Sequence, residues 1–174
     1  CPNVESEGMA FGVDPKVVEQ VTKAVRKVTD KPVIVKLSPN VTDIVEIAKA
    51  VEAGGGNGVS LINTLLGMAI DIHRRKPLLG NIYGGLSGPA VKPVALRMVH
   101  QVYKGVTIPI IGLGGIMSGT DAIEFMMAGA QAVQVGTATM VDPTAISRIA
   151  REMGDFVEQY NLNSITDIVG AVHQ

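Results

Sequence analysis

The stretches Pro109-Ile110-Ile111-Gly112-Leu113-Gly114-Gly115-Ile116 and Ala132-Val133-Gln134-Val135-Gly136-Thr137-Ala138 decide the fold class. Each is a short apolar run that ends in glycine and is followed by a helical pattern. Such a run is typical of a buried parallel strand whose carboxyl end lets a ligand approach the backbone. In (β/α)8 barrels the loops after strands 7 and 8 form a phosphate site of this kind. Together the two stretches predict a phosphate-bearing ligand, which suggests a cofactor.

The size and composition of the chain exclude several classes of protein. Its 174 residues suffice for one well-buried domain, with 47% hydrophobic and 18% charged residues. The net charge of −1 argues against a nucleic-acid partner, and the single cysteine suits a reducing cytoplasm. No apolar run approaches the roughly 18 residues of a membrane span. We therefore expect a cytoplasmic protein, and because the chain opens with Cys1 we expect it to belong to a longer one.

A strand–helix alternation repeats along the chain. We predict four strands, over residues 32–37, 58–63, 109–114 and 132–137. Helices are predicted to start at Asp14 and Thr42, each as an N-cap, and near Pro89, Thr120 and Asp142. With helices between them the four strands are of the parallel type, and right-handed crossovers between them follow by rule.

The number of strand–helix units limits the architecture. Four units fit a small open sheet, but the chemistry at the strand ends favours a barrel. Since a complete (β/α)8 barrel has eight strands and about 250 residues, we interpret residues 1–174 as the C-terminal half of one TIM-barrel domain. A half barrel has two unpaired edge strands, which favour pairing with another chain.

Lys36 interrupts the apolar run Val33-Ile34-Val35-Lys36-Leu37. By alternation its side chain shares a side of the strand with Ile34. A lysine there is costly to bury unless it faces an anion or a hydrogen-bond acceptor, so we favour a ligand contact. The alternative is a lysine that snorkels to solvent from a frayed strand end.

Polar or glycine residues follow every predicted strand, at the face where barrel active sites are assembled. Asn63 and Thr64 either contact a ligand or, in the case of Asn63, only tie a turn. The segment Gly84-Gly85-Leu86-Ser87-Gly88-Pro89 is either an anion site at a helix start or a flexible loop with proline at N1. With Gly114-Gly115 and Gly136-Thr137 it makes three glycine-lined approaches, and Thr137 adds a hydroxyl donor.

Two further segments are open to more than one interpretation. A lone cysteine is more often a small buried hydrophobe than a reactive thiol. Cys1, however, stands in a polar, glycine-bearing segment typical of a loop, where cysteines are less often core residues. The charge run His73-Arg74-Arg75-Lys76 lies in the long segment 64–88. We interpret it as a solvated hairpin tip, with a docking surface or part of a lid as the alternatives.

In combination these residues resemble class 1B dihydroorotate dehydrogenase, in its flavin-bearing catalytic subunit. The matching segments run in family order over nearly the whole chain, at residues 1–4, 35–44, 62–64, 84–89, 112–115 and 135–138. The resemblance implies oxidation of dihydroorotate to orotate in pyrimidine biosynthesis. It also implies that the hydride passes to FMN and that the electrons continue to NAD⁺.

The resemblance implies a role for each site residue. Cys1 would be the general base that removes a proton from C5 of dihydroorotate, a task that suits a thiol of ordinary pKa near 8.5. The residues implied to hydrogen-bond the pyrimidine are Asn3, Asn63 and Thr64. Those implied to contact FMN are Lys36 and Ile62 at the ring, Gly88 at the ribityl chain, and Gly114, Gly115, Gly136 and Thr137 at the phosphate.

The resemblance also implies a partner subunit that carries FAD and a [2Fe–2S] cluster and reduces NAD⁺. With one cysteine this chain has too few thiolates to hold a cluster, and we expect no metal on it. A homo-oligomer within the larger complex is expected, with no nucleic acid and no membrane as partners.

Three rival interpretations remain open. The flavin domain of dihydropyrimidine dehydrogenase shares the Cys-Pro start and the segment around residues 38–43, although Cys1-Pro2-Asn3 and residues 135–138 favour the orotate enzyme. A non-catalytic half barrel that only binds phosphate or a partner chain is the second. The third, an open α/β nucleotide-binding domain, is disfavoured because no G-x-G-x-x-G turn follows an early strand.

Overall fold

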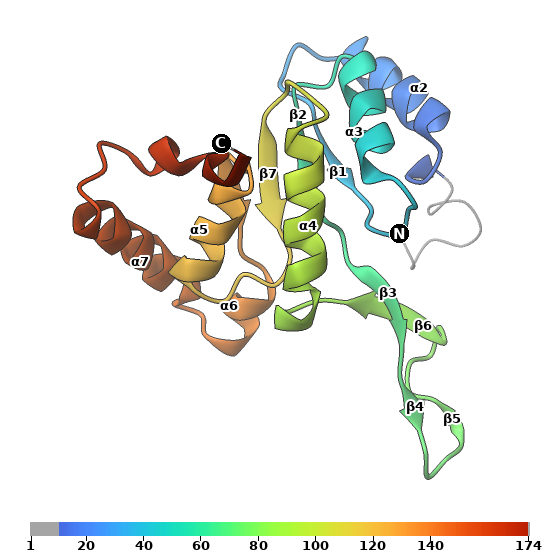
Figure 1. Ribbon diagram of the computed structural model, residues 1–174. Helices are drawn as coiled ribbons and strands as arrows, with labels where there is room; N and C mark the ends of the chain where they lie inside the picture. Colours follow the sequence, from blue (N-terminus) through green and yellow to red (C-terminus); the bar gives the residue numbers. More distant parts are fainter. Residues whose placement is uncertain (1–10, 174) are drawn as a thin grey trace.

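The computed structural model describes residues 11–173 and has an α/β architecture around one parallel sheet (Figure 1). The sheet order is β1-β2-β7-β8, with every neighbouring pair parallel. The strands are β1 (Ile34–Leu37), β2 (Gly58–Leu61), β7 (Ile110–Leu113) and β8 (Ala132–Gln134). All four lie within the predicted ranges and are shorter. Strands β2, β7 and β8 end early because the chain leaves the sheet to form the polar and glycine loops, whereas β1 only begins later than predicted.

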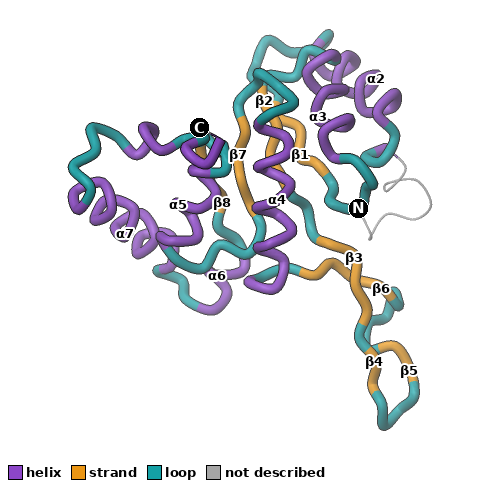
Figure 2. The backbone as a smooth tube through the Cα atoms, in the orientation of Figure 1, coloured by secondary structure: helices purple, strands orange, loops and turns teal. Residues whose placement is uncertain are grey.

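Helices connect the strands and cover one face of the sheet (Figures 1 and 2). The helices that connect the strands are α3 (Ile44–Ala53), α4 (Lys92–Tyr103) and α5 (Gly119–Met127). Of the other helices, α2 (Pro15–Arg26) precedes β1, and α6 (Thr137–Val141) and α7 (Ala145–Gln159) follow β8. Short 3-10 turns are η1 (Pro89–Val91), η2 (Ile165–Ile168) and η3 (Ala171–His173). The strand order never reverses, so right-handed crossovers bring all the connecting helices to the same side. Accordingly α3 packs on β1 and β2, and α4 packs on β2 and β7.

The two faces of the sheet differ in burial. Leu37, Val59 and Ile110 belong to the hydrophobic core that the sheet shares with the helices, and each is at most 2% exposed. On β1, Ile34 and Lys36 lie on the opposite side of the strand from Leu37, and both are exposed. Within residues 11–173 no helix covers that side, so the sheet has one packed face and one open face.

Several helix starts differ from the prediction because a neighbouring side chain caps the helix better. Asp43 replaces Thr42 as the cap of α3, since its carboxylate accepts the N–H of Val45 at 2.8 Å. Ser118 caps α5 in a capping box with Asp121, ahead of the predicted start at Thr120. The predicted cap at Asp14 is confirmed.

The helix predicted at Asp142 is also displaced. The Asp142 carboxylate accepts hydrogen bonds from the N–H and the hydroxyl of Thr144, so α7 begins only at Ala145. The preceding short helix α6 was not predicted. Five residues are too few to leave a helical period in the sequence.

The long segment between β2 and α4 forms an arm that projects from the body (Figures 1 and 2). Its strands β3 (Leu65–Met68) and β6 (Tyr83–Leu86) pair antiparallel, and β4 (Ile70–Asp71) pairs with β5 (Lys76–Pro77) beyond them. The turn between β4 and β5 holds His73, Arg74 and Arg75 of the predicted charge run, and Lys76 begins β5. The Asp71 carboxylate accepts the N–H groups of His73 and Arg74 there, at 3.0 Å each. The hairpin-tip interpretation of this run is therefore confirmed.

Candidate functional site

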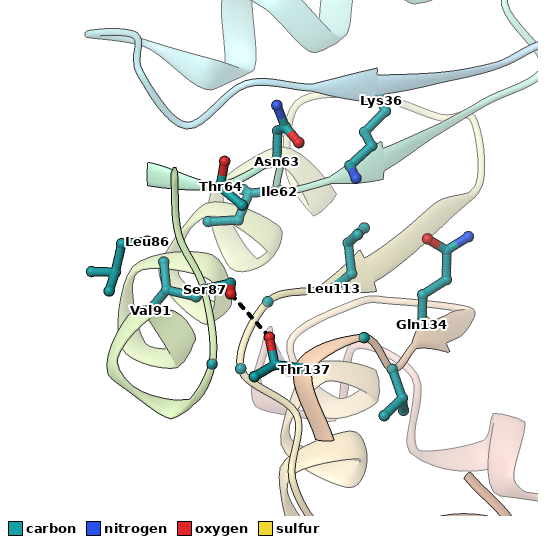
Figure 3. A pocket seen from close by; sticks show the side chains of 15 residues that line it. Lys36, Ile62, Asn63, Thr64, Leu86, Ser87, Val91, Leu113, Gln134 and Thr137 are labelled. Carbon is teal, nitrogen blue, oxygen red and sulfur yellow. Dashed lines mark hydrogen bonds between the residues drawn. The ribbon is translucent and has the colours of Figure 1, made fainter. Parts of the chain in front are cut away.

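A cavity of about 300 Å³ opens at the carboxyl ends of the four parallel strands (Figure 3). Its lining residues are Lys36, Ile62, Asn63, Thr64, Leu86, Ser87, Gly88, Val91, Leu113, Gly114, Gly115, Gln134, Val135, Gly136 and Thr137. The structure thus brings every predicted site residue of the described part of the chain into one cavity. Cys1 and Asn3 lie outside the described residues.

Two glycine loops meet with their backbones in contact. Gly88 and Gly115 both have positive φ, +84° and +79°. A Cβ at Gly115 would lie 2.6 Å from the carbonyl oxygen of Gly88 and 2.8 Å from the backbone nitrogen of Lys92. Only glycine fits at Gly115, because L side chains rarely adopt this backbone conformation and no space remains for one.

The third glycine loop leaves room beside it. A Cβ placed on Gly136 would meet no atom within 4 Å, so the backbone here borders open space. The next residue, Thr137, donates its hydroxyl hydrogen to Ser87 Oγ at 3.0 Å, as the dashed line in Figure 3 shows. This bond joins the loop after β8 to the loop before α4 across the cavity.

Lys36 differs from its sequence prediction in one respect. Its side chain lies on the same side of β1 as Ile34, as predicted, and points into the cavity (Figure 3). It is exposed, however, so the expectation of a costly buried lysine is wrong. The reason is that no described element covers this face of the sheet. Lys36 forms no salt bridge within residues 11–173, and it is the one charged side chain on the cavity wall that these residues form.

Asn63 and Thr64 are held in place by their backbones. The Asn63 N–H donates to the Leu37 carbonyl oxygen at 2.8 Å, and the Asn40 amide donates to the Thr64 carbonyl oxygen at 3.2 Å. The Asn63 side chain makes no hydrogen bond to any described residue, so it does not tie a turn there. Its amide remains free to bind a ligand.

Sequence reasoning missed two polar residues of the cavity, Ser87 and Gln134. Ser87 lies inside a segment that was singled out only for its glycines. Gln134 follows Val133 in β8 and faces the cavity (Figure 3). It carries the same signal as Lys36, a polar side chain alternating with apolar ones.

An ion pair between α4 and α5 holds the loop after β7 in place. Lys92 Nζ lies 2.6 Å from Asp121 Oδ1, and the other Asp121 oxygen accepts the N–H groups of Met117 and Ser118 at 2.8 and 3.0 Å. Burial alone would raise the pKa of Asp121, but these hydrogen bonds outweigh it and hold the pKa below its usual range. Hydrogen bonds to Asp121 and then to Glu124 raise the pKa of Lys92. Both groups are therefore charged at neutral pH.

Two other kinds of site find no support within residues 11–173. No three His, Cys, Asp or Glu side chains gather there in a way that would hold a metal ion. Among the helices of this part of the chain, none has the length and apolar character needed to cross a bilayer.

Comparison with known protein families gives a match to dihydroorotate dehydrogenase over residues 1–157. The chain belongs to the dihydroorotate dehydrogenase family. This result confirms the predicted resemblance. It also confirms the predicted fold class, since the family is a TIM-barrel family and the four parallel β/α units form part of such a barrel.

Individual members of the family are similar over almost the whole chain. The chain is 61% identical over 170 residues to the "Dihydroorotate dehydrogenase B (NAD(+)), catalytic subunit" of Alkaliphilus oremlandii, an alignment that covers 98% of this chain and 56% of the relative. It is 62% identical over 173 residues to the protein of the same name from Desulforamulus reducens, covering 99% of this chain and 57% of the relative. The chain thus spans about half the length of the curated relatives it matches.

Proposed function

We propose that this chain is the C-terminal half of a single FMN-binding TIM-barrel domain that oxidises dihydroorotate to orotate in pyrimidine biosynthesis. The observation that carries the proposal is the convergence of Lys36, Asn63, Thr64 and three glycine loops on one cavity. The names of its relatives, each a dihydroorotate dehydrogenase catalytic subunit, support the same reaction.

The chemistry of the cavity fits a flavin mononucleotide. One end is lined by Gly114, Gly115 and Gly136, which carry no side chains, with Thr137 beside them. At Gly136 the backbone borders open space, so a phosphate can approach it there. The other end carries Lys36 and the apolar Ile62, which suit a flat ring that becomes negatively charged when it is reduced. FMN, when bound, would supply the hydride acceptor.

The protein's own residues would bind and orient the two reactants. The Lys36 ammonium would stabilise negative charge on the ring, and Gly88 would contact the ribityl chain. Asn63 and Thr64 would hydrogen-bond the pyrimidine, together with Asn3. Cys1 would remove the proton from C5 of dihydroorotate while a hydride leaves C6, so that the substrate loses two hydrogens as a proton and a hydride. The roles of Cys1 and Asn3 rest on the family resemblance.

The names of the relatives also support a partner. "B (NAD(+)), catalytic subunit" describes a protein that works with another subunit and with NAD⁺. We propose an electron-transfer subunit that carries FAD and a [2Fe–2S] cluster and reduces NAD⁺. We further propose a homo-oligomer of the catalytic subunit within this complex, and a cytoplasmic location.

The test uses the full-length protein that contains this chain. Purified protein should carry FMN, and dihydroorotate added without oxygen should bleach the visible flavin absorption. Dihydrouracil serves as the control that separates the dihydropyrimidine dehydrogenase alternative. A protein that takes up no FMN would support a half barrel that only binds phosphate or a partner. Bleaching by dihydrouracil and not by dihydroorotate would overturn the proposed substrate.

A further inference from the structure

Arg148 on α7 contacts the segments that follow two of the glycine loops. Its Nη2 donates to the Met117 carbonyl oxygen at 3.2 Å, and Met117 is two residues beyond Gly115. Its Nε donates to Asp142 Oδ2 at 3.4 Å, and Asp142 directly follows α6, the helix that begins at Thr137. One guanidinium group therefore joins the loop after β7 to the helix after β8.

A carboxylate on the same helix completes the arrangement. Glu152 Oε1 accepts from Arg148 Nη1 at 3.0 Å, and Glu152 Oε2 accepts the N–H of Gly119, the first residue of α5. The hydrogen bond from Gly119, and after it the one from Arg148, lower the pKa of Glu152, so this carboxylate is charged at neutral pH. Met117 and Gly119, which flank Ser118, are thus both tied to α7.

Arg148 has no direct access to a ligand in the cavity. It is not among the residues that line it, and two carboxylates, Asp142 and Glu152, already neutralise its charge. Its contribution is therefore one of geometry, because a guanidinium presents donors in a rigid planar fork and can hold three acceptors at fixed positions. A lysine ammonium keeps the charge but lacks this fork.

We propose that Arg148 is a positioning residue that holds the loop at Gly114-Gly115 and the loop at Gly136-Thr137 at the separation required to bind one phosphate. The inference rests on the proposed function, since it assumes that both loops contact the phosphate of FMN. A site of this kind works only when its binding groups are held within about 0.5 Å of the required geometry. A change at Arg148 should therefore affect the phosphate of the ligand and leave the contacts to its ring intact.

The test compares FMN with riboflavin, which has the same ring and ribityl chain but no phosphate. In the full-length protein freed of flavin, Arg148→Lys should weaken FMN binding about tenfold, or about 1.4 kcal/mol. Riboflavin affinity should change by less than about twofold, the change expected when ring contacts stay intact. Arg151→Lys is the matched control, because Arg151 lies three residues after Arg148 on α7 and is exposed. It should change neither affinity. Flavin fluorescence titration measures both affinities for the unmodified protein and for the two variants.

Other outcomes decide against the inference. If Arg148→Lys weakens the binding of FMN and riboflavin equally, or weakens neither, the positioning role is overturned. Unmodified protein that binds riboflavin as tightly as FMN overturns the proposed phosphate site itself, whatever Arg148 does. Should Arg148→Lys fail to fold, Asp142→Ala removes one acceptor of the same fork. It should lower FMN affinity about threefold with riboflavin affinity unchanged, and an unchanged FMN affinity would contradict the inference.

Discussion

At Gly115 the fold depends on the absence of a side chain. Gly115→Ala combines an unfavourable φ of +79° with contact to two backbone atoms, which cannot move aside as a flexible side chain can. We expect it to lower the free energy of unfolding by about 1–3 kcal/mol. Gly136→Ala is the matched control, because its φ is −115° and its Cβ meets open space, and it should stay within about 0.5 kcal/mol. Denaturant unfolding measures both, and equal losses would contradict the expectation.

Lys36 separates stability from function at a single position. Its side chain is exposed and forms no ion pair with a described residue, so Lys36→Met should change the free energy of unfolding by less than about 0.5 kcal/mol. In the proposed reaction the same change removes a positive charge beside the ring, and we expect flavin reduction by dihydroorotate to slow about a hundredfold. Stopped-flow absorbance measures this rate. Lys49→Met on exposed α3 surface is the control, and comparable slowing by both variants would contradict a ring contact.

At the scale of the element, the arm contrasts with the body. Ile72 in the turn of the arm is 74% exposed, whereas Ile47 on α3 is 2% exposed. The same Ile→Ala substitution should therefore lower the free energy of unfolding by different amounts at the two positions. Ile47→Ala should cost about 2–5 kcal/mol of unfolding free energy, and Ile72→Ala less than about 0.5 kcal/mol. Urea unfolding of the two variants checks this. A large loss at Ile72 would show that the arm packs on something in solution.

The C-terminal turn η3 is attached to the body through stacked rings. The ring of His173 lies 4.1 Å from that of His100 and 4.7 Å from that of Tyr103, both on α4. His173 Nε2 lies 3.0 Å from the Ala128 carbonyl oxygen, while Nδ1 is buried without a partner among the described residues. Burial, and after it the charges of His173 and Lys104, lower the pKa of His100. These effects favour the neutral form of the His100 imidazole.

The lowered pKa of His100 predicts a pH dependence of stability. Below the ordinary histidine pKa of about 6.5, the unfolded chain binds a proton at His100 that the native state binds less readily. Stability is thus complete above that pH and should fall as the pH drops from it toward the lowered value. His100→Phe keeps a ring in the stack and should flatten the dependence, whereas His73→Gln in the arm should leave it unchanged. Thermal unfolding across this window tests the prediction, and equal slopes for all three proteins would refute it.

The sequence predicted the elements better than their boundaries and surroundings. Apolar runs that end in glycine are local patterns, so residues 109–114 and 132–137 revealed β7 and β8 directly. The cap of α3 depended on a competition between Thr42 and Asp43 that spacing alone does not decide. The exposure of Lys36 depends on what covers its face of the sheet, which is a tertiary property. The Arg148 contacts join segments distant in the chain, and no motif marks them.

At the scale of the whole molecule, the two faces of the parallel sheet differ, since one is buried and the other is open. The helices bury one face of the sheet, while Ile34 and Lys36 leave the other exposed. Within residues 11–173, β1 and β8 each pair with a strand on one side only. In the proposed barrel, further strands would pair with both edges and enclose the open face. The same surfaces decide how these 174 residues behave when they are produced alone.

The open edges predict self-association of the isolated chain. Unpaired backbone groups on β1 and β8, beside the 50% exposed side chain of Ile34, form a template for another copy. Sedimentation velocity over a concentration series should show mass rising with concentration. Ile34→Lys places a charge on the open face beside the β1 edge and should reduce the association. Val28→Lys, at an 83% exposed position after α2, should leave it unchanged. A stable monomer at every concentration would contradict the open half-barrel arrangement.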